Sequence, residues 1–185
     1  MRELSLNVMD IAQNSIVAGA SLLEIGLCEN TAEHILSITI KDNGSGMDED
    51  ALKSVTNPFY TKRTTRKVGL GVPLFKMACE QTGGSFFIDS QLGKGTSITA
   101  VFKTDSVDFT PIGDMVETVG LLISCNPNMD VVYTHRRDEG ELTLDTRELR
   151  EILGGDVALD TPDVSLWIKD YLKEQTALLY GGETN

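Results

Sequence analysis

Apolar residues recur at helical spacing over the first stretch of the chain, residues 3–18. Five residues fall on one side of the helix that this spacing predicts: Leu4, Val8, Ile11, Ser15 and Ala18. Three polar residues lie together on one flank of that side: Asn7, Asp10 and Asn14. The flank is either a strip that meets water or a set of polar groups aimed into a cleft. In the second interpretation Asn14 offers an oxygen ligand for Mg²⁺, and Asp10 acts as a base or orients water.

The pattern downstream predicts two strands, over residues 21–30 and 34–42, joined by a polar turn. A glycine-rich loop at 42–47, a short helix at 47–55 and a basic, irregular connection then lead to a helix over 72–84. Two apolar runs over 85–104 predict a hairpin. This order of elements predicts an α+β fold, an α/β sandwich in which helices cover one face of a mixed sheet.

A polar break around Pro111 places the domain edge, giving one domain at 1–105 and a small C-terminal α+β extension at 106–185. The extension is predicted to contain a helix near 112–125, a hairpin near 130–146 and helices near 146–153 and 162–178. It fits no motif. We expect it to bind a partner or to pair two chains as a homodimer, using an apolar surface from residues 111–125 and Trp167.

Composition and net charge exclude several kinds of binding partner and location. The chain has 185 residues, 41% of them hydrophobic, and a formal net charge of −12, which argues against nucleic acid and against an anionic membrane as partners. No apolar segment is long enough for a membrane span, and no secretory signal is evident. The cysteines, Cys28, Cys79 and Cys125, are expected as buried small hydrophobes in a reducing compartment, so the expected location is cytoplasmic.

Three glycine-containing loops carry candidate chemistry. In "DNGSGM", Asp42 directly follows a strand and can accept a hydrogen bond from an amine such as that of adenine, while Gly44 and Gly46 allow close backbone approach; an ordinary turn is the alternative. In "KVGLGVPLFKM", Gly69 and Gly71 open a helix whose free N–H groups can bind an anion. The third loop, "LGKGTS", is a glycine-containing hairpin turn.

The second loop matches neither a Walker A nor a Rossmann fingerprint. It follows a basic cluster, "TKRTTRK", which contains Lys62, Arg63, Arg66 and Lys67. The cluster is either a solvated loop or, because it stands just before the glycines, a phosphate contact.

Taken in order, Asp-x-x-x-Asn-Ser on the first helix, "DNGSGM", "NPFYTKR", "GLG" and "GKGT" resemble the motifs of the GHKL ATP-binding family over about residues 3–103. That family includes histidine kinases, anti-sigma-factor serine kinases, DNA gyrase, heat-shock chaperones and mismatch-repair ATPases. The resemblance implies a Bergerat fold, with ATP or ADP between the helical layer and a short lid at 60–68. It also implies Mg²⁺ held by Asn14 and the adenine amine bound by Asp42.

The resemblance implies a set of nucleotide-binding residues, which are Asn7, Asn14, Asp42, Gly44, Gly46, Met47, Phe59, Thr61, Lys62, Lys67, Gly69, Leu70, Gly71, Gly95 and Thr96. Asp10 is the candidate catalytic residue. It stands where hydrolysing members usually carry Glu and histidine kinases usually carry Asn. Asp has the same chemistry on a shorter arm, so water activation is possible but expected to be poor. His34 and His135 are expected as surface or structural residues.

Two classes of function follow from these observations. The first is a Mg-ATP-dependent protein kinase that transfers phosphate to a His or Ser of a protein partner in signal transduction. The second is a nucleotide-gated binding module, in which ATP closes the lid and changes what the extension or the sheet can bind. A slow ATP hydrolase is a third interpretation, with Asp10 as its base.

Overall fold

A computed structural model describes residues 3–56 and 70–182 and contains one six-stranded sheet in the order β3-β4-β2-β1-β5-β6. The strands are β1 (Leu22–Asn30), β2 (Ile35–Asp42), β3 (Ser85–Gln91), β4 (Gly95–Lys103), β5 (Asp130–Arg137) and β6 (Gly140–Asp145). The helices are α1 (Leu4–Val17), α2 (Glu49–Val55), α3 (Gly71–Gln81), α4 (Met115–Cys125), α5 (Thr146–Ile152) and α6 (Pro162–Leu179). Neighbouring strands are antiparallel except β1 and β5, which are parallel. The predicted helices and strands are all present.

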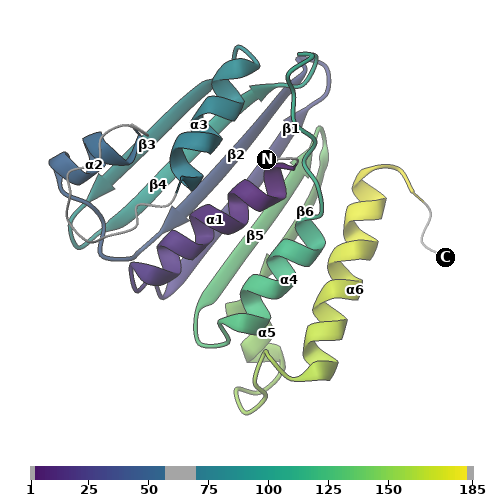
Figure 1. Cartoon of the computed structure of the whole chain (residues 1–185). Coiled ribbons are helices and arrows are strands. Elements are labelled where there is room, and N and C mark those ends of the chain that lie inside the picture. Colours follow the sequence, from purple (N-terminus) through teal and green to yellow (C-terminus); the bar gives the residue numbers. More distant parts are fainter. Residues whose placement is uncertain (1–2, 57–69, 183–185) are drawn as a thin grey trace.

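The helices α1, α3, α4 and α6 lie over one face of the sheet (Figure 1). Strand residues that point to this face are buried, as the alternation in β1 shows for Leu23, Ile25 and Leu27. The opposite face carries polar pairs, such as the hydrogen bond between Thr39 and Thr99 at 3.2 Å. The predicted mixed sheet with helices on one face is therefore confirmed.

The C-terminal part of the chain extends the same sheet. Strand β5 lies beside β1, and α4 packs against α1. The first turn of α1 is also joined to the loop before α4: the backbone N–H groups of Leu4 and Ser5 donate to the carbonyls of Pro111 and Ile112, at 2.9 and 2.7 Å. Most apolar side chains of α4, including Val119, are buried in the hydrophobic core. The prediction of an exposed apolar surface over residues 111–125 is therefore wrong for these side chains of α4, whereas a separate domain at 106–185 stays a prediction.

A polar cluster ties the end of α6 to the sheet. Nε2 of His135 and the hydroxyl of Tyr180 lie 2.7 and 2.5 Å from the same Glu29 carboxylate oxygen, and the Arg137 guanidinium lies 4.7 Å from the Tyr180 ring centre. Burial alone raises the pKa of Glu29, but the hydrogen bonds from His135 and Tyr180, with the nearby charges, lower the pKa below its ordinary value. His135 lies within β5 and is buried, which makes it structural as expected.

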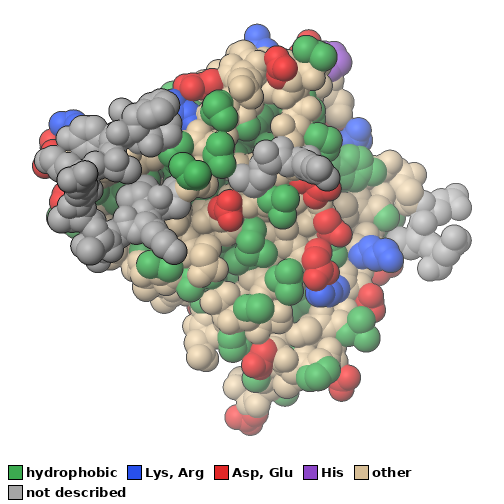
Figure 2. Space-filling model, in the orientation of Figure 1, with side chains coloured by type: hydrophobic (Ala, Val, Ile, Leu, Met, Phe, Trp, Pro, Cys, Tyr) green, Lys and Arg blue, Asp and Glu red, His purple; other side chains and the backbone are tan. Residues whose placement is uncertain are grey.

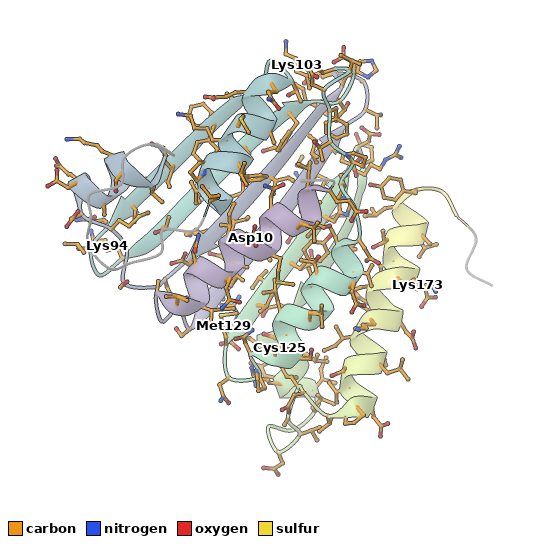
Figure 3. The ribbon with its side chains drawn as sticks, viewed as in Figure 1. Asp10, Lys94, Lys103, Cys125, Met129 and Lys173 are labelled. Atoms are coloured by element: carbon orange, nitrogen blue, oxygen red, sulfur yellow. The ribbon has the colours of Figure 1, made fainter. Side chains whose placement is uncertain are left out.

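The three cysteines occupy two different environments. Cys79 is buried in α3, and burial raises the pKa of its thiol to about 11. Cys28 and Cys125 are exposed, and Figure 3 labels Cys125 at the end of α4, so the prediction that all three are buried is wrong for these two. Among the described residues, no helix is long and apolar enough to cross a bilayer.

Candidate functional site

A cavity of about 150 Å³ lies between α1 and the ends of β2 and β4 that adjoin α2 and α3. Its walls are largely apolar and come from four elements, through Ile11, Val55, Val72 and Ile98. Its polar groups are Asn14, Ser15, Asp42 and Thr96. Apolar walls around a few placed polar groups are typical of small-molecule sites. The first helix and two of the three predicted glycine loops, at 42–47 and 92–97, therefore meet at one cavity.

Asp42 is the last residue of β2, and its carboxylate is held from two sides. The hydroxyl of Ser15 donates a hydrogen bond of 2.6 Å to Oδ2, and the backbone N–H of Gly44 donates one of 2.9 Å to Oδ1. Each carboxylate oxygen has two lone pairs, so both keep room for a further donor. The arrangement presents an oriented acceptor to an N–H of a ligand.

The loop after β2 and the turn between β3 and β4 approach each other more closely than a side chain would allow. Gly46 has φ +65°, and a Cβ there would lie 2.0 Å from the carbonyl oxygen of Gln91. Gly95 has φ +104°, and a Cβ there would lie 1.9 Å from the carbonyl oxygen of Asp42. Both positions require glycine for conformation and for space. The two loops are thereby fixed against each other beside Asp42.

Ser90 links these two loops, although no motif in the sequence points to it. Its Oγ accepts from the backbone N–H of Met47 at 2.9 Å, donates to the carbonyl of Gly95 at 2.9 Å and lies 2.8 Å from Oγ1 of Thr96. A serine inside a strand looks like a surface residue until the strand register is known. Register places Thr96 between Ser90 on β3 and Asp42 on β2, and that pairing is the signal that could have identified it.

The polar flank of α1 divides into three different environments. Asn14 is exposed and lines the cavity. Asp10, labelled in Figure 3, is exposed beside the start of α3, where a Cβ added to Gly71 would lie 3.0 Å from the Cβ of Asp10. Asn7 is 1% exposed, its Nδ2 has no hydrogen-bond partner among the described residues, and it does not line the cavity. The three side chains therefore do not converge on one point.

Comparison with known proteins assigns this part of the chain to a family. Residues 1–106 match the family described as histidine kinase-, DNA gyrase B- and HSP90-like ATPases. The chain belongs to this ATPase family. The matched range includes every residue that lines the cavity, so the cavity lies inside the ATPase-family segment.

Two relatives of the ATPase-family segment are bacterial sensor proteins. The sensor histidine kinase YvrG of Bacillus subtilis is 37% identical over 81 residues, which cover 42% of this chain and 14% of that protein. The sensor protein SrrB of Staphylococcus aureus is 38% identical over 102 residues, which cover 52% of this chain and 17% of that protein. The chain therefore corresponds to a small fraction of the length of these curated relatives.

A solved structure shares the fold. The N-terminal domain of a DNA repair protein superposes with a TM-score of 0.54 at 15% identity, covering 78% of this chain and 53% of that chain. At this identity the likeness concerns the fold alone. It supports the Bergerat-type arrangement expected from the motifs for this ATPase-family chain.

Several predicted ligand contacts lie outside the described residues. Phe59, Thr61, Lys62, Lys67 and Gly69 all fall within 57–69, as do the basic cluster and the predicted lid, so these assignments stay predictions. Of the adjoining residues, Leu70 is exposed just before α3 and Gly71 is its first residue. The predicted glycine at a helix start is therefore present at position 71.

The side chains at the cavity are compatible with Mg²⁺ that arrives with a nucleotide. No group of three or more His, Cys, Asp and Glu side chains is close enough to hold a metal by itself in the part of the chain that the structure describes. Asn14 offers one amide oxygen at the cavity wall. Mg²⁺ commonly keeps several waters and takes one or two protein ligands together with substrate phosphates. A single Asn is therefore a suitable ligand for a metal–nucleotide complex.

Proposed function

We propose that the chain binds Mg-ATP in the cavity between α1, β2 and β4. The observation that carries this proposal is the Asp42 carboxylate, which Ser15 and Gly44 orient at an apolar cavity within an ATPase-family segment. Its remaining lone pairs accept from the exocyclic amine of adenine. The side chains of Ile11, Val72 and Ile98 pack against the flat ring.

In this proposal Asn14 and the start of α3 bind the phosphates and their metal ion. Asn14 holds Mg²⁺ by its amide oxygen, and the metal neutralises part of the phosphate charge. The free N–H groups at the start of α3, beginning at Gly71, favour an anion. Close packing of Gly71 against Asp10 brings this helix start beside α1, the helix that carries Asn14.

We further propose that the bound ATP donates its γ-phosphate to a His or Ser of a protein partner. Support comes from the similarity to bacterial sensor proteins, of which YvrG is a sensor histidine kinase. Phosphoryl transfer depends mainly on positioning and charge neutralisation, which the proposed site can supply without a protein nucleophile. Asp10, exposed beside Gly71, is the residue available to orient an acceptor or a water molecule.

A nucleotide-gated binding module is the second candidate, and one feature of the fold favours it. Helix α1 lines the cavity and also packs against α4, while its first turn is hydrogen-bonded to the loop at Pro111 and Ile112. A ligand that shifts α1 would therefore also change the position of α4 and of the loop before it.

The two candidates differ in the fate of the γ-phosphate. The purified chain is incubated with γ-labelled ATP, alone and with protein extract from its own source, and label is followed on protein and as free phosphate. The kinase proposal predicts labelled protein only when chain and extract are both present, with the label lost in the Asp42→Asn variant. Binding without any label transfer in extract would contradict the kinase proposal and leave the gated module. Label released as free phosphate and abolished by Asp10→Asn would identify a hydrolase.

A further inference from the structure

An apolar groove lies between α5 and the start of α6, remote in the sheet order from the ATP cavity. It has a volume of about 350 Å³ and is lined by Leu149, Ile152, Leu153, Asp163, Val164 and Trp167. The cavity proposed for ATP lies at β2 and β4, whereas α5 follows β6 at the opposite edge of the sheet (Figure 1). The two sites share no residue.

Two of the apolar side chains at this groove are largely exposed, whereas Leu149 beside them is buried. Ile152 is 80% exposed and Trp167 is 51% exposed. Trp167 is held in place because it stacks on Tyr171, with ring centres 5.3 Å apart and planes at 9°, and the Tyr171 hydroxyl donates to the carbonyl of Thr143 on β6. A large aromatic ring fixed in an open apolar groove is typical of an anchor for a partner.

The segment that forms the groove is rich in acidic residues. Seven carboxylate residues occur in 146–174: Glu148, Glu151, Asp156, Asp160, Asp163, Asp170 and Glu174. None of them forms an ion pair with a described residue: Arg147, Arg150 and Lys169 pair with Asp145, Asp130 and Glu117 outside this set, and Lys173 is the one further cation of the range. Figure 2 shows red acidic side chains beside green apolar ones at the lower end of the molecule, where α5 meets α6. The segment that forms the groove therefore carries more acidic than basic residues, and one of its carboxylates, Asp163, lines the groove beside the apolar walls.

The apolar walls and the acidic residues together favour one kind of binding partner for the α5–α6 groove. A second copy of the chain would bring the same carboxylates together, which costs free energy through like-charge repulsion. An anionic lipid surface would be repelled for the same reason. An amphipathic helix with Lys and Arg beside its apolar face satisfies both properties, since its apolar residues fill the groove and its cations meet the acidic residues. We propose that the α5–α6 groove docks a basic amphipathic helix of a partner protein.

Trp167 is the only tryptophan of the chain and reports directly on this groove. The probe is a synthetic, tryptophan-free peptide of about 18 residues, five helical turns, with Leu at helical spacing and Lys on the other face. Titrated into the full chain, it is expected to shift Trp167 emission to the blue with saturation, because docking buries the ring. Affinity is expected to fall as salt rises. A peptide with the same residues scrambled, and one with Glu for Lys, are each expected to bind at least about tenfold more weakly.

Matched substitutions locate the binding. Ile152→Asp places a charge in the groove, whereas Val107→Asp places the same charge at a 99% exposed position between β4 and α4. Calorimetry with the Leu/Lys peptide is expected to show at least about tenfold weaker binding to Ile152→Asp and unchanged binding to Val107→Asp. Both variants should keep the melting temperature within a few degrees, since each site is exposed.

Three results would overturn the proposal. The first is equal binding of the amphipathic and scrambled peptides, and the second is equal binding by the two Asp variants. The third is a dimer in sedimentation velocity that Ile152→Asp converts to monomer, which would make a second copy the occupant. None of these readouts involves nucleotide, so their outcome is independent of the proposed ATP site.

Discussion

The Asp42 carboxylate depends on residues that surround it as much as on its own position in the sequence. Ser15 fixes one oxygen, Gly44 the other, and Gly95 lets the neighbouring turn pass against the Asp42 backbone. Ser90 then holds that turn to the loop that follows Asp42, through Met47. An oriented acceptor costs no reorganisation when a ligand arrives, which is the basis of preorganised binding.

Gly95 and Gly93 provide a matched pair for testing this close approach. Both have positive φ, but a Cβ at Gly95 would meet the Asp42 carbonyl at 1.9 Å, whereas a Cβ at Gly93 would meet nothing within 4 Å. Gly93→Ala is expected to lower the free energy of unfolding by about 1–2 kcal/mol through backbone strain alone. Gly95→Ala is expected to cost clearly more, measured from urea unfolding midpoints with unchanged slopes. Equal losses would mean that the two loops are not in contact as described.

The sequence indicates features that are local along the chain and misses contacts that depend on a distant partner. Asp42, Gly44 and Gly46 were selected because a strand end followed by a glycine loop is visible in the sequence. Ser15 was assigned to the apolar side of its helix, and its partner Asp42 is 27 positions away. That partner is known only once α1 is packed on the sheet. Tertiary contact was therefore the missing information.

At the scale of elements, α1 and α6 are held by different kinds of contact. Helix α1 is buried between the sheet, α3 and α4, whereas the end of α6 is fixed through polar contacts of Tyr180 with Glu29 and Arg137. Spacing of apolar residues predicted both helices, because a buried stripe leaves a clear period. It could not predict the polar attachment of α6, since Glu29 and Tyr180 are 151 positions apart.

The Glu29 cluster makes the attachment of α6 sensitive to acid. The folded-state pKa of Glu29 is lowered, so the stability it contributes is present above the unfolded pKa and is lost as pH falls through the folded pKa. Glu29→Gln is therefore expected to lower the free energy of unfolding by about 1–3 kcal/mol near pH 7, where a charged acceptor is lost. The difference from wild type should shrink below about pH 4.

Denaturant titrations at the two pH values check this prediction. Glu139→Gln serves as the control, because Glu139 is exposed in the turn between β5 and β6. A constant difference between wild type and Glu29→Gln at both pH values would show that the carboxylate charge does not hold α6.

At the scale of the whole molecule, the sheet joins the ATPase-family segment to the rest of the chain. Residues 1–106 supply the first four strands, and β5 pairs in parallel with β1, one of the two central strands of the six-stranded sheet. The sequence predicted the strands. The domain edge at 105–106, placed there because a polar break with Pro111 usually marks one, stays a prediction. The order of strands in the sheet depends on pairing between segments far apart in the chain, and a local sequence pattern cannot predict such pairing.

The central claim is that Mg-ATP binds at Asp42, and titration calorimetry on three matched chains tests it most directly. The chains are wild type, Asp42→Asn, and Asp108→Asn, which changes an exposed carboxylate in the loop between β4 and α4. Wild type and Asp108→Asn are predicted to bind at one site with the same affinity, and saturation at 100 times Kd should add about 2.7 kcal/mol to the free energy of unfolding. Asp42→Asn is predicted to fold but to bind at least about tenfold more weakly, since an amide N–H₂ replaces an acceptor. Equal affinity for all three chains, or no binding by wild type, would contradict the account.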